Sequence, residues 1–208
     1  MLCRFATLVA VICGALLPLT SAQGVPQGTY RTIQARGLRQ NYGPSGSQPN
    51  PKVSDTAIAK VASHTTTVSG QVTFYQADPR APVQIKYSLT GLKPNQIYHY
   101  HVHESPVGEN LDCSAAGGHY DPTKVNKGAA TYKCNPNDAF ATCELGDLSG
   151  RFGPIVATGT GLAQSSQTYR DVYLGIRNGN IIANRAVVVH NEKGDRVACG
   201  NILVQAAN

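Results

Sequence analysis

The 208-residue chain lacks the signatures of most enzyme classes. It has no G-x-S-x-G nucleophile motif, no P-loop and no dinucleotide-binding fingerprint, so the enzymes that depend on those motifs have no support. It also lacks clusters of basic residues, although 18 Lys and Arg outnumber 12 Asp and Glu. We therefore expect no nucleic-acid partner. The diffuse positive charge would attract small anions, but solubility alone also explains it.

Long apolar runs are absent except at the N-terminus. Arg4 is the single charge among the first 22 residues, the run FATLVAVICGALLPL follows it, and small residues precede Gln23. This order is typical of a secretory signal peptide at residues 1–22, cleaved after Ala22. The run is shorter than the roughly 20 residues that a membrane span requires. We expect a secreted, extracellular protein with no membrane span.

Removing the 22 signal residues from 208 leaves about 186, which suits one domain with its own core. Two of the six cysteines leave with the signal. The four that remain are Cys113, Cys134, Cys143 and Cys199. An even number of cysteines outside the cell predicts two disulfides. Spacing alone does not choose among the three possible pairings.

Residues 23–57 form a polar leader rich in Gly, Pro, Ser, Gln and Asn, and the folded domain is expected at residues 58–208. Alternating apolar residues predict strands within 65–76, 82–92, 96–105, 171–180 and 185–205. No segment shows a helical period. The prediction is an all-β sandwich with a long loop region from about Leu111 to Gly161, which its cysteines indicate to be ordered.

Histidine is concentrated in one stretch, HYHVHE, at residues 99–104. Side chains at positions i and i+2 of a strand point to the same face, so His99, His101 and His103 would stand in one row. Such a row either binds a metal or is simply the polar face of a half-buried strand. His64 lies apart from this stretch, and we interpret it as an ordinary polar residue at a strand edge.

Two further histidines lie at informative places. His119 belongs to the loop sequence CSAAGGHYDP, and His190 ends the apolar run AVVVH. If the fold joins the strand, the loop and the later strand, His101, His103, His119 and His190 converge. Neutral imidazole is a good ligand for copper, zinc, iron or nickel.

The ordered motifs HVHES, CSAAGGHYDP, GDLSG, VVVH and RVACGNI resemble the copper/zinc superoxide dismutase family, over about residues 53–204. The resemblance implies a Greek-key β-sandwich or barrel, in agreement with the predicted strands, and superoxide anion as the substrate. It implies the copper ligands His101, His103, His119 and His190. It also implies a Cys113–Cys199 disulfide and a substrate-guiding role for Arg196, and it places His99 outside the ligand set.

The chain departs from the zinc-containing members of that family at two places. No histidine lies between His119 and Asp147, and Glu144 occupies the position of one zinc ligand. Carboxylates without imidazole make a poor zinc site. Only NEKGD separates His190 from Arg196, where zinc-type members carry a long loop. Both changes resemble the secreted copper-only members, so we expect one copper per chain, no zinc and an open copper site.

Individual roles follow from this resemblance. Glu144 is the candidate to orient His119 and to relay a proton to the departing peroxide, and the alternative is a solvated loop carboxylate. Asp147 is expected to organise its loop through backbone hydrogen bonds. Arg196 would attract and orient superoxide, unless it merely pairs with Asp195 on the surface.

The other two cysteines, Cys134 and Cys143, are expected to form a local disulfide beside Glu144. Rival functions are a secreted copper-binding or storage protein without turnover, a zinc-bearing dismutase with ligands from elsewhere, and an adhesion module on the same scaffold. The sequence does not give the oligomeric state, the role of the leader or the route of copper loading. It leaves open whether the basic leader holds the protein at a cell wall.

Overall fold

The structure, a computed structural model, describes residues 54–126, 128, 130–164 and 168–206. The expected signal peptide and residues 23–53 of the expected leader lie outside the described residues. The first strand, β1, begins at Asp55, three residues before the expected domain boundary at 58. Within the described residues no helix is long and apolar enough to span a bilayer.

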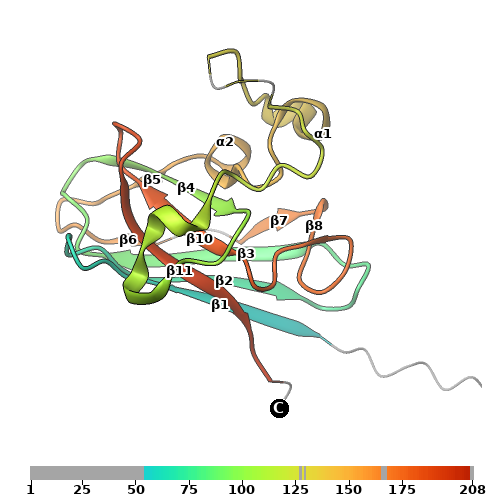
Figure 1. The fold of residues 1–208 in the computed structure, drawn as a ribbon, viewed down its shortest axis with the longest axis horizontal. Coiled ribbons are helices and arrows are strands. Elements are labelled where there is room, and N and C mark those ends of the chain that lie inside the picture. The colour runs from blue at the N-terminus through green and yellow to red at the C-terminus, as the bar shows by residue number, and fades with distance from the viewer. Residues whose placement is uncertain (1–53, 127, 129, 165–167, 207–208) are drawn as a thin grey trace, which may run out of the picture. The chain divides into compact units, whose positions relative to one another are not determined.

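Nine strands form one antiparallel sheet that curls around the core (Figure 1). Its strands are β1 (Asp55–Val61), β2 (Ser69–Gln76), β3 (Val83–Thr90), β4 (Ile97–His103), β5 (Ile155–Val156), β6 (Ala163–Gln164), β7 (Tyr169–Asp171), β10 (Ala186–His190) and β11 (Arg196–Val204). Their order is β5-β4-β10-β11-β1-β2-β3-β6, with β7 also paired to β3. The last strand therefore returns to lie beside the first, and β4 pairs with β10 rather than with its sequence neighbour β3. This crossover order agrees with the expected all-β Greek-key fold.

The predicted strand segments are confirmed in the sheet, with differences in detail. The segments at 65–76, 82–92 and 96–105 contain β2, β3 and β4, and 185–205 contains β10 and β11. The segment at 171–180 holds the end of β7 and short strands rather than one continuous strand. Asp171 ends β7 because its side chain accepts hydrogen bonds from the backbone N–H groups of Tyr173 and Leu174, which turns the chain. A short parallel pair, β8 (Leu174–Gly175) and β9 (Asn180–Ile181), follows.

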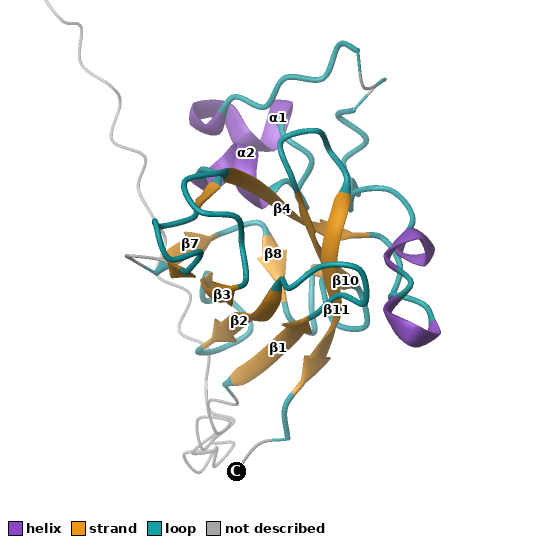
Figure 2. Ribbon diagram, turned by 90° about the vertical axis from the view of Figure 1, so that its left-hand side faces the viewer, coloured by secondary structure: helices purple, strands orange, loops and turns teal. Residues whose placement is uncertain are grey.

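The described residues of the long loop region include helices that are too short for a helical period to be read from the sequence. They are α1 (Ala139–Thr142), α2 (Leu148–Phe152) and the 3-10 turns Glu109–Leu111, Cys113–Ala116 and Pro136–Asp138. The two α-helices lie together beyond β4 (Figure 2). Ser149 of α2 accepts a hydrogen bond from the backbone N–H of Tyr100 at 2.6 Å, which fixes α2 against β4.

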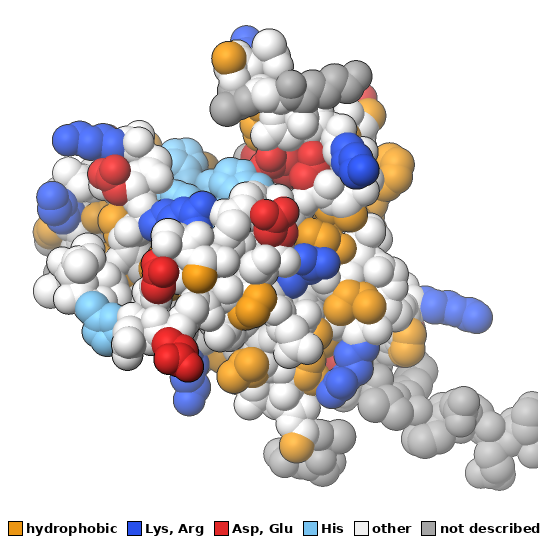
Figure 3. Space-filling model, viewed as in Figure 1, with side chains coloured by type: hydrophobic (Ala, Val, Ile, Leu, Met, Phe, Trp, Pro, Cys, Tyr) orange, Lys and Arg blue, Asp and Glu red, His pale blue; other side chains and the backbone are white. Residues whose placement is uncertain are grey.

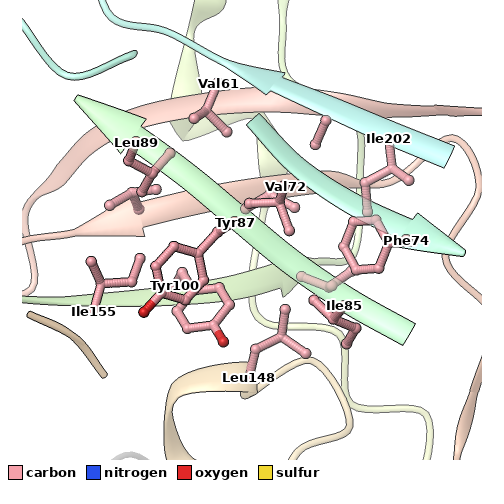
Figure 4. Packing of buried hydrophobic residues seen from close by; sticks show 14 of the residues in the cluster. Val61, Val72, Phe74, Ile85, Tyr87, Leu89, Tyr100, Leu148, Ile155 and Ile202 are labelled. Carbon is pink, nitrogen blue, oxygen red and sulfur yellow. The ribbon is translucent and has the colours of Figure 1, made fainter. Parts of the chain in front are cut away.

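The core lies inside the curl of the sheet, where alternating residues of β2 and β3 point inward. Figure 4 shows the rings of Tyr87 and Tyr100 side by side, with Leu148 of α2 beneath them. The two rings meet edge to face with centroids 5.4 Å apart. Leu148 is fully buried, and complete burial of such a side chain stabilises the fold by about 1.5–3 kcal/mol. This burial makes α2, a helix of the long loop region, part of the core and fixes its position.

Candidate metal centre

Neighbouring strands place three histidines on one face. His101 and His103 lie two residues apart in β4, and β10 runs antiparallel beside it. His190, at the end of β10, pairs directly with His99 of β4. Because paired residues and residues two apart share a face, His190 joins the row of β4. A β-bridge between His103 and His119 adds the loop histidine.

The loop approaches β4 closely because residue 146 is a glycine. The N–H of Gly146 donates to the carbonyl of Tyr120 at 2.8 Å, and its carbonyl accepts from the N–H of Val102 at 2.8 Å. A Cβ at this position would lie 2.3 Å from the Val102 carbonyl oxygen, which the packing does not allow. This contact sets the flanking carboxylates, Glu144 and Asp147, against the histidine face.

The four histidines that the sequence singled out form one cluster. One nitrogen from each of His101, His103, His119 and His190 lies within 4.8 Å of the others. Nε2 of His103 lies 3.2 Å from Nε2 of His190. His103 is fully buried, whereas the side chain of His119 is 30% exposed. In Figure 3 histidine side chains reach the surface in a hollow at the upper edge of this face, beside a basic side chain. The centre is therefore open to solvent at one side.

The hydrogen bonds of two rings assign their tautomers. Nδ1 of His103 donates to the carbonyl of Gly117 at 3.0 Å, and Nδ1 of His190 donates to the carbonyl of Gly194 at 3.0 Å. Each bond requires the proton on Nδ1, so each Nε2 carries a lone pair. Two lone pairs 3.2 Å apart repel one another unless a cation or a proton lies between them. This arrangement fits a metal ligand pair.

The other two rings complete the donor set. Nδ1 of His119 lies 2.5 Å from Oε2 of Glu144 and donates to it, which leaves Nε2 free. Nε2 of His101 faces Oδ1 of Asp147 at 3.5 Å, and this carboxylate favours the proton on Nε2. Nδ1 of His101 is buried and has no hydrogen-bond partner among the described residues. A buried lone pair without a partner is costly, and a bound metal ion would satisfy it.

The buried rings stay neutral at neutral pH. Burial, together with neighbouring positive groups such as Arg196, lowers the pKa of His103 to about 3 and that of His190 to about 4. Burial also lowers the pKa of His101 well below its ordinary value. Neutral imidazole is the form that binds a metal, so this donor set fits copper or another borderline metal ion without displacing protons.

Glu144 is a buried carboxylate, and the alternative of a solvated loop residue is wrong for its position. Its side chain is 4% exposed. Oε2 accepts from His119, and Oε1 accepts from Nδ2 of Asn126 at 2.5 Å. Metal-binding histidines generally donate their second N–H to a carboxylate or a carbonyl in this way. Asn126 has no motif around it, so no sequence signal indicated this contact.

Asp147 organises its loop, as expected, and does more. Its Oδ1 accepts from the N–H of Gly150 at 2.7 Å and so caps the N-terminus of α2. The same oxygen faces His101, and Oδ2 accepts a hydrogen bond from the hydroxyl of Tyr132 at 2.8 Å. The contacts with His101 and Tyr132 were missed by the sequence reasoning. The position of Tyr132 two residues before Cys134 was the one available signal.

Arg196 is anchored beside the cluster by backbone carbonyls. Its guanidinium donates to the carbonyl of Cys113 at 2.5 Å and to that of Gly117 at 2.6 Å. The neighbouring Asp195 accepts from the side chain of Asn191 instead. The alternative of a surface Arg196–Asp195 pair therefore does not describe this structure.

Both expected disulfides are present. Cys113–Cys199 joins the loop before His119 to β11, and Cys134–Cys143 closes a short span beside Glu144. Two histidines lie outside the cluster. The ring of His99 stacks on that of His101 with centroids 6.5 Å apart, and His64 is exposed in the bend after β1 rather than at a strand edge.

Comparison with known proteins gives one consistent result. The family model described as copper/zinc superoxide dismutase matches residues 68–202. The cell surface superoxide dismutase (Cu-Zn) 4 of Candida albicans is 34% identical over 139 residues, which cover 65% of this chain and 53% of that protein. The cell surface Cu-only superoxide dismutase 5 of the same organism is 32% identical over 142 residues, covering 66% and 55%.

A solved structure is also similar. Candida albicans superoxide dismutase 5 with Cu(II) superposes with a TM-score of 0.60 and 27% identity, covering 75% of this chain and 95% of that one. Against the full-length sequences of the two Candida proteins, this chain spans about half their length.

Proposed function

The chain belongs to the copper/zinc superoxide dismutase family, and from that premise we propose that it dismutates superoxide to O2 and hydrogen peroxide with one bound copper and no zinc. The observation that carries this proposal is the cluster of four histidine nitrogens, one from each ring, which lie within 4.8 Å of one another. The Cu-only name of one relative and the Cu(II) in a similar structure support the choice of metal.

The zinc-free part of the proposal rests on His119. Its Nδ1 donates to Glu144 and is therefore not free to hold a second metal. Asn126 occupies the other oxygen of the same carboxylate. The position that would serve a zinc ion is thus filled by a hydrogen-bonded pair, which supports a single-metal centre.

Copper would supply one-electron chemistry, in which one superoxide is oxidised to O2 and a second is reduced to peroxide. The protein supplies binding and protons. Arg196 carries a permanent positive charge beside His103 and His190, where it would attract and orient the superoxide anion. Because its guanidinium is held by backbone carbonyls, the charge is fixed in place before substrate arrives.

Glu144 and His119 would handle the proton. His119 is exposed on one side and bonded to a buried carboxylate on the other, so its ring is suited to pass a proton between solvent and the reduced product. Glu144 keeps the ring oriented through its hydrogen bond with Nδ1. Asp147 would hold His101 with Nδ1 presented to the metal.

The proposed location is outside the cell, with attachment to the cell surface as the further possibility that its relatives suggest. Several relatives are named cell surface or extracellular enzymes, and the expected signal peptide at 1–22 agrees with secretion. N-terminal sequencing of the protein recovered from culture medium and from washed cells would test both points. A chain that retains residues 1–22 inside the cell would contradict the proposal.

The central test combines metal analysis with kinetics on the secreted protein after copper reconstitution. We expect about one copper per chain, negligible zinc after incubation with both metals, and rapid superoxide consumption in pulse radiolysis. His103→Gln should lose most of the copper. The matched variants His64→Gln and His99→Gln alter histidines outside the cluster and should retain it.

Each other outcome has a distinct meaning. If the protein bound copper without consuming superoxide, its function would be copper binding or storage rather than catalysis. Stoichiometric zinc beside copper would overturn the single-metal proposal. Loss of copper in His64→Gln would show that the cluster is not the binding site.

A further inference from the structure

The hydroxyl of Tyr132 links Glu144 to Asp147, two acidic residues whose carboxylates face different histidines. It donates to Oδ2 of Asp147 at 2.8 Å and accepts from the backbone N–H of Glu144 at 3.0 Å. One hydroxyl thus fixes both the start of the 144–147 turn and the side chain near its end. Burial and the hydrogen bond to Asp147 raise the pKa of Tyr132, so its hydroxyl remains a proton donor.

Both carboxylates in turn contact rings of the metal cluster. Glu144 accepts from Nδ1 of His119, and Asp147 faces Nε2 of His101 at 3.5 Å. The connected path runs from His119 through Glu144 and Tyr132 to Asp147 and His101. Among the described residues, no other hydroxyl is recorded in contact with both Glu144 and Asp147.

The covalent structure keeps Tyr132 in this place. It lies two residues before Cys134, whose disulfide partner Cys143 directly precedes Glu144. The disulfide therefore holds the loop segment that contains Tyr132 against the turn that contains Glu144 and Asp147.

We infer that Tyr132 is a positioning residue of the copper centre, whose hydroxyl holds the Glu144–His119 and Asp147–His101 pairs in one fixed relation. The inference rests on the copper site proposed above. Loss of the hydroxyl would release one oxygen of Asp147 and leave the N–H of Glu144 without its acceptor. Both rings would then be less firmly oriented toward the metal.

The test compares Tyr132→Phe with the matched variant Tyr98→Phe. The hydroxyl of Tyr98 also accepts a backbone N–H, from Lys93 at 2.8 Å, but it has no recorded contact with a carboxylate. Each variant therefore removes one hydroxyl and orphans one backbone N–H. Only Tyr132→Phe removes a link to the cluster.

Three readouts separate positioning from general destabilisation. The first is the electron paramagnetic resonance spectrum of the Cu(II)-loaded protein, and the second is copper affinity by chelator competition. The third is the ring-nitrogen NMR shifts of His101 and His119 in the metal-free protein. We expect Tyr132→Phe to shift the copper spectrum, to move both sets of ring resonances and to weaken copper binding about tenfold or more. Tyr98→Phe should show only a lower midpoint of thermal unfolding.

An unchanged copper spectrum and affinity in Tyr132→Phe would overturn the inference, as would equal spectral changes in both variants. A shift at His119 alone would also contradict it, because the proposed link joins two histidines. If the parent protein bound copper without consuming superoxide, the proposed activity would fail. The spectra of the two variants would still decide the role of Tyr132.

Discussion

Replacement of Glu144 by glutamine is the most informative single change at this centre. The substitution keeps the shape of the side chain and removes its charge. In the parent protein both carboxylate oxygens accept hydrogen bonds, Oε2 from His119 and Oε1 from Asn126. A glutamine amide has one acceptor and one donor group, so in either orientation an N–H faces another N–H. Asn126 cannot turn over freely, because its own carbonyl oxygen accepts from Gly128 at 2.9 Å.

The magnitude follows from these two losses. A hydrogen bond to a charged group contributes about 1.5–3 kcal/mol and a neutral one about 0.5–1.5 kcal/mol, so loss of the charge costs about 1 kcal/mol. The unsatisfied donor adds about 1 kcal/mol more. Together these make about 2 kcal/mol, equivalent to about 30-fold in an equilibrium constant. Because the loop can relax in part, we expect copper binding to weaken about 10- to 30-fold, with a similar fall in the rate of superoxide consumption.

The assay is chelator competition for copper, followed by pulse radiolysis of the copper-saturated protein. Glu104→Gln is the matched control. Glu104 directly follows His103 and accepts the N–H of Gly118 at 2.9 Å, a role that an amide oxygen retains. The control removes the same unit of charge close to the cluster without altering a recorded histidine contact, so it separates local bonding from net charge.

A Glu144→Gln protein with copper affinity and rate within about twofold of the parent would refute the argument, since that difference is far below the expected 10-fold. It would mean that the short contact with His119 does not stabilise the ligand. Equal losses in Glu144→Gln and Glu104→Gln would assign the effect to net charge instead.

Three other predictions concern charge, covalent structure and pH. Because a fixed charge near the site raises the encounter rate, Arg196→Ala should lower the second-order rate constant with superoxide about tenfold at low ionic strength, and Arg196→Lys should be intermediate. Stopped-flow or pulse radiolysis across a salt series would check this. Salt-independent rates in the parent protein would contradict it. Replacing both Cys113 and Cys199 by serine should lower the free energy of unfolding by about 4–5 kcal/mol, as the chain-entropy relation gives for two cysteines 86 residues apart. Urea denaturation measures this free energy. A loss below about 1 kcal/mol would contradict the prediction. Because burial holds the pKa values of His103 and His190 at about 3 and about 4, the unfolded chain binds more protons below about pH 6.5, so the metal-free protein should lose stability as pH falls. The loss between pH 7 and pH 5 is about 2 kcal/mol for each ring, and an unchanged urea midpoint across that range would contradict it.

Local pattern was sufficient for the central strands of this protein. The alternation of β2, β3 and β4 is regular, and each is long enough for its period to be read. The short elements were not readable in this way. The helix α2 has five residues and β8 has two, so neither is long enough for its period to repeat, and both are held by contacts from elsewhere.

The sequence by itself determined which groups are available to this centre. The spacing of two in β4, the glycine-rich loop before His119 and the histidine at the end of β10 are local facts, and family resemblance joined them into one ligand set. The absence of histidine between His119 and Asp147, with Glu144 at the position of one zinc ligand, was equally visible. These features depend only on residue type and order along the chain.

The tertiary structure alone decided which nitrogen of each ring is free and what holds the carboxylates. Those properties depend on hydrogen bonds between distant segments, such as the carbonyl of Gly194 for His190 and the hydroxyl of Tyr132 for Asp147. Tyr132 and Asn126 stand in no motif, and their contacts exist because the Cys134–Cys143 disulfide and the close approach at Gly146 bring the loop back onto β4. A sequence specifies such contacts only through the whole fold, since no local period or spacing records them.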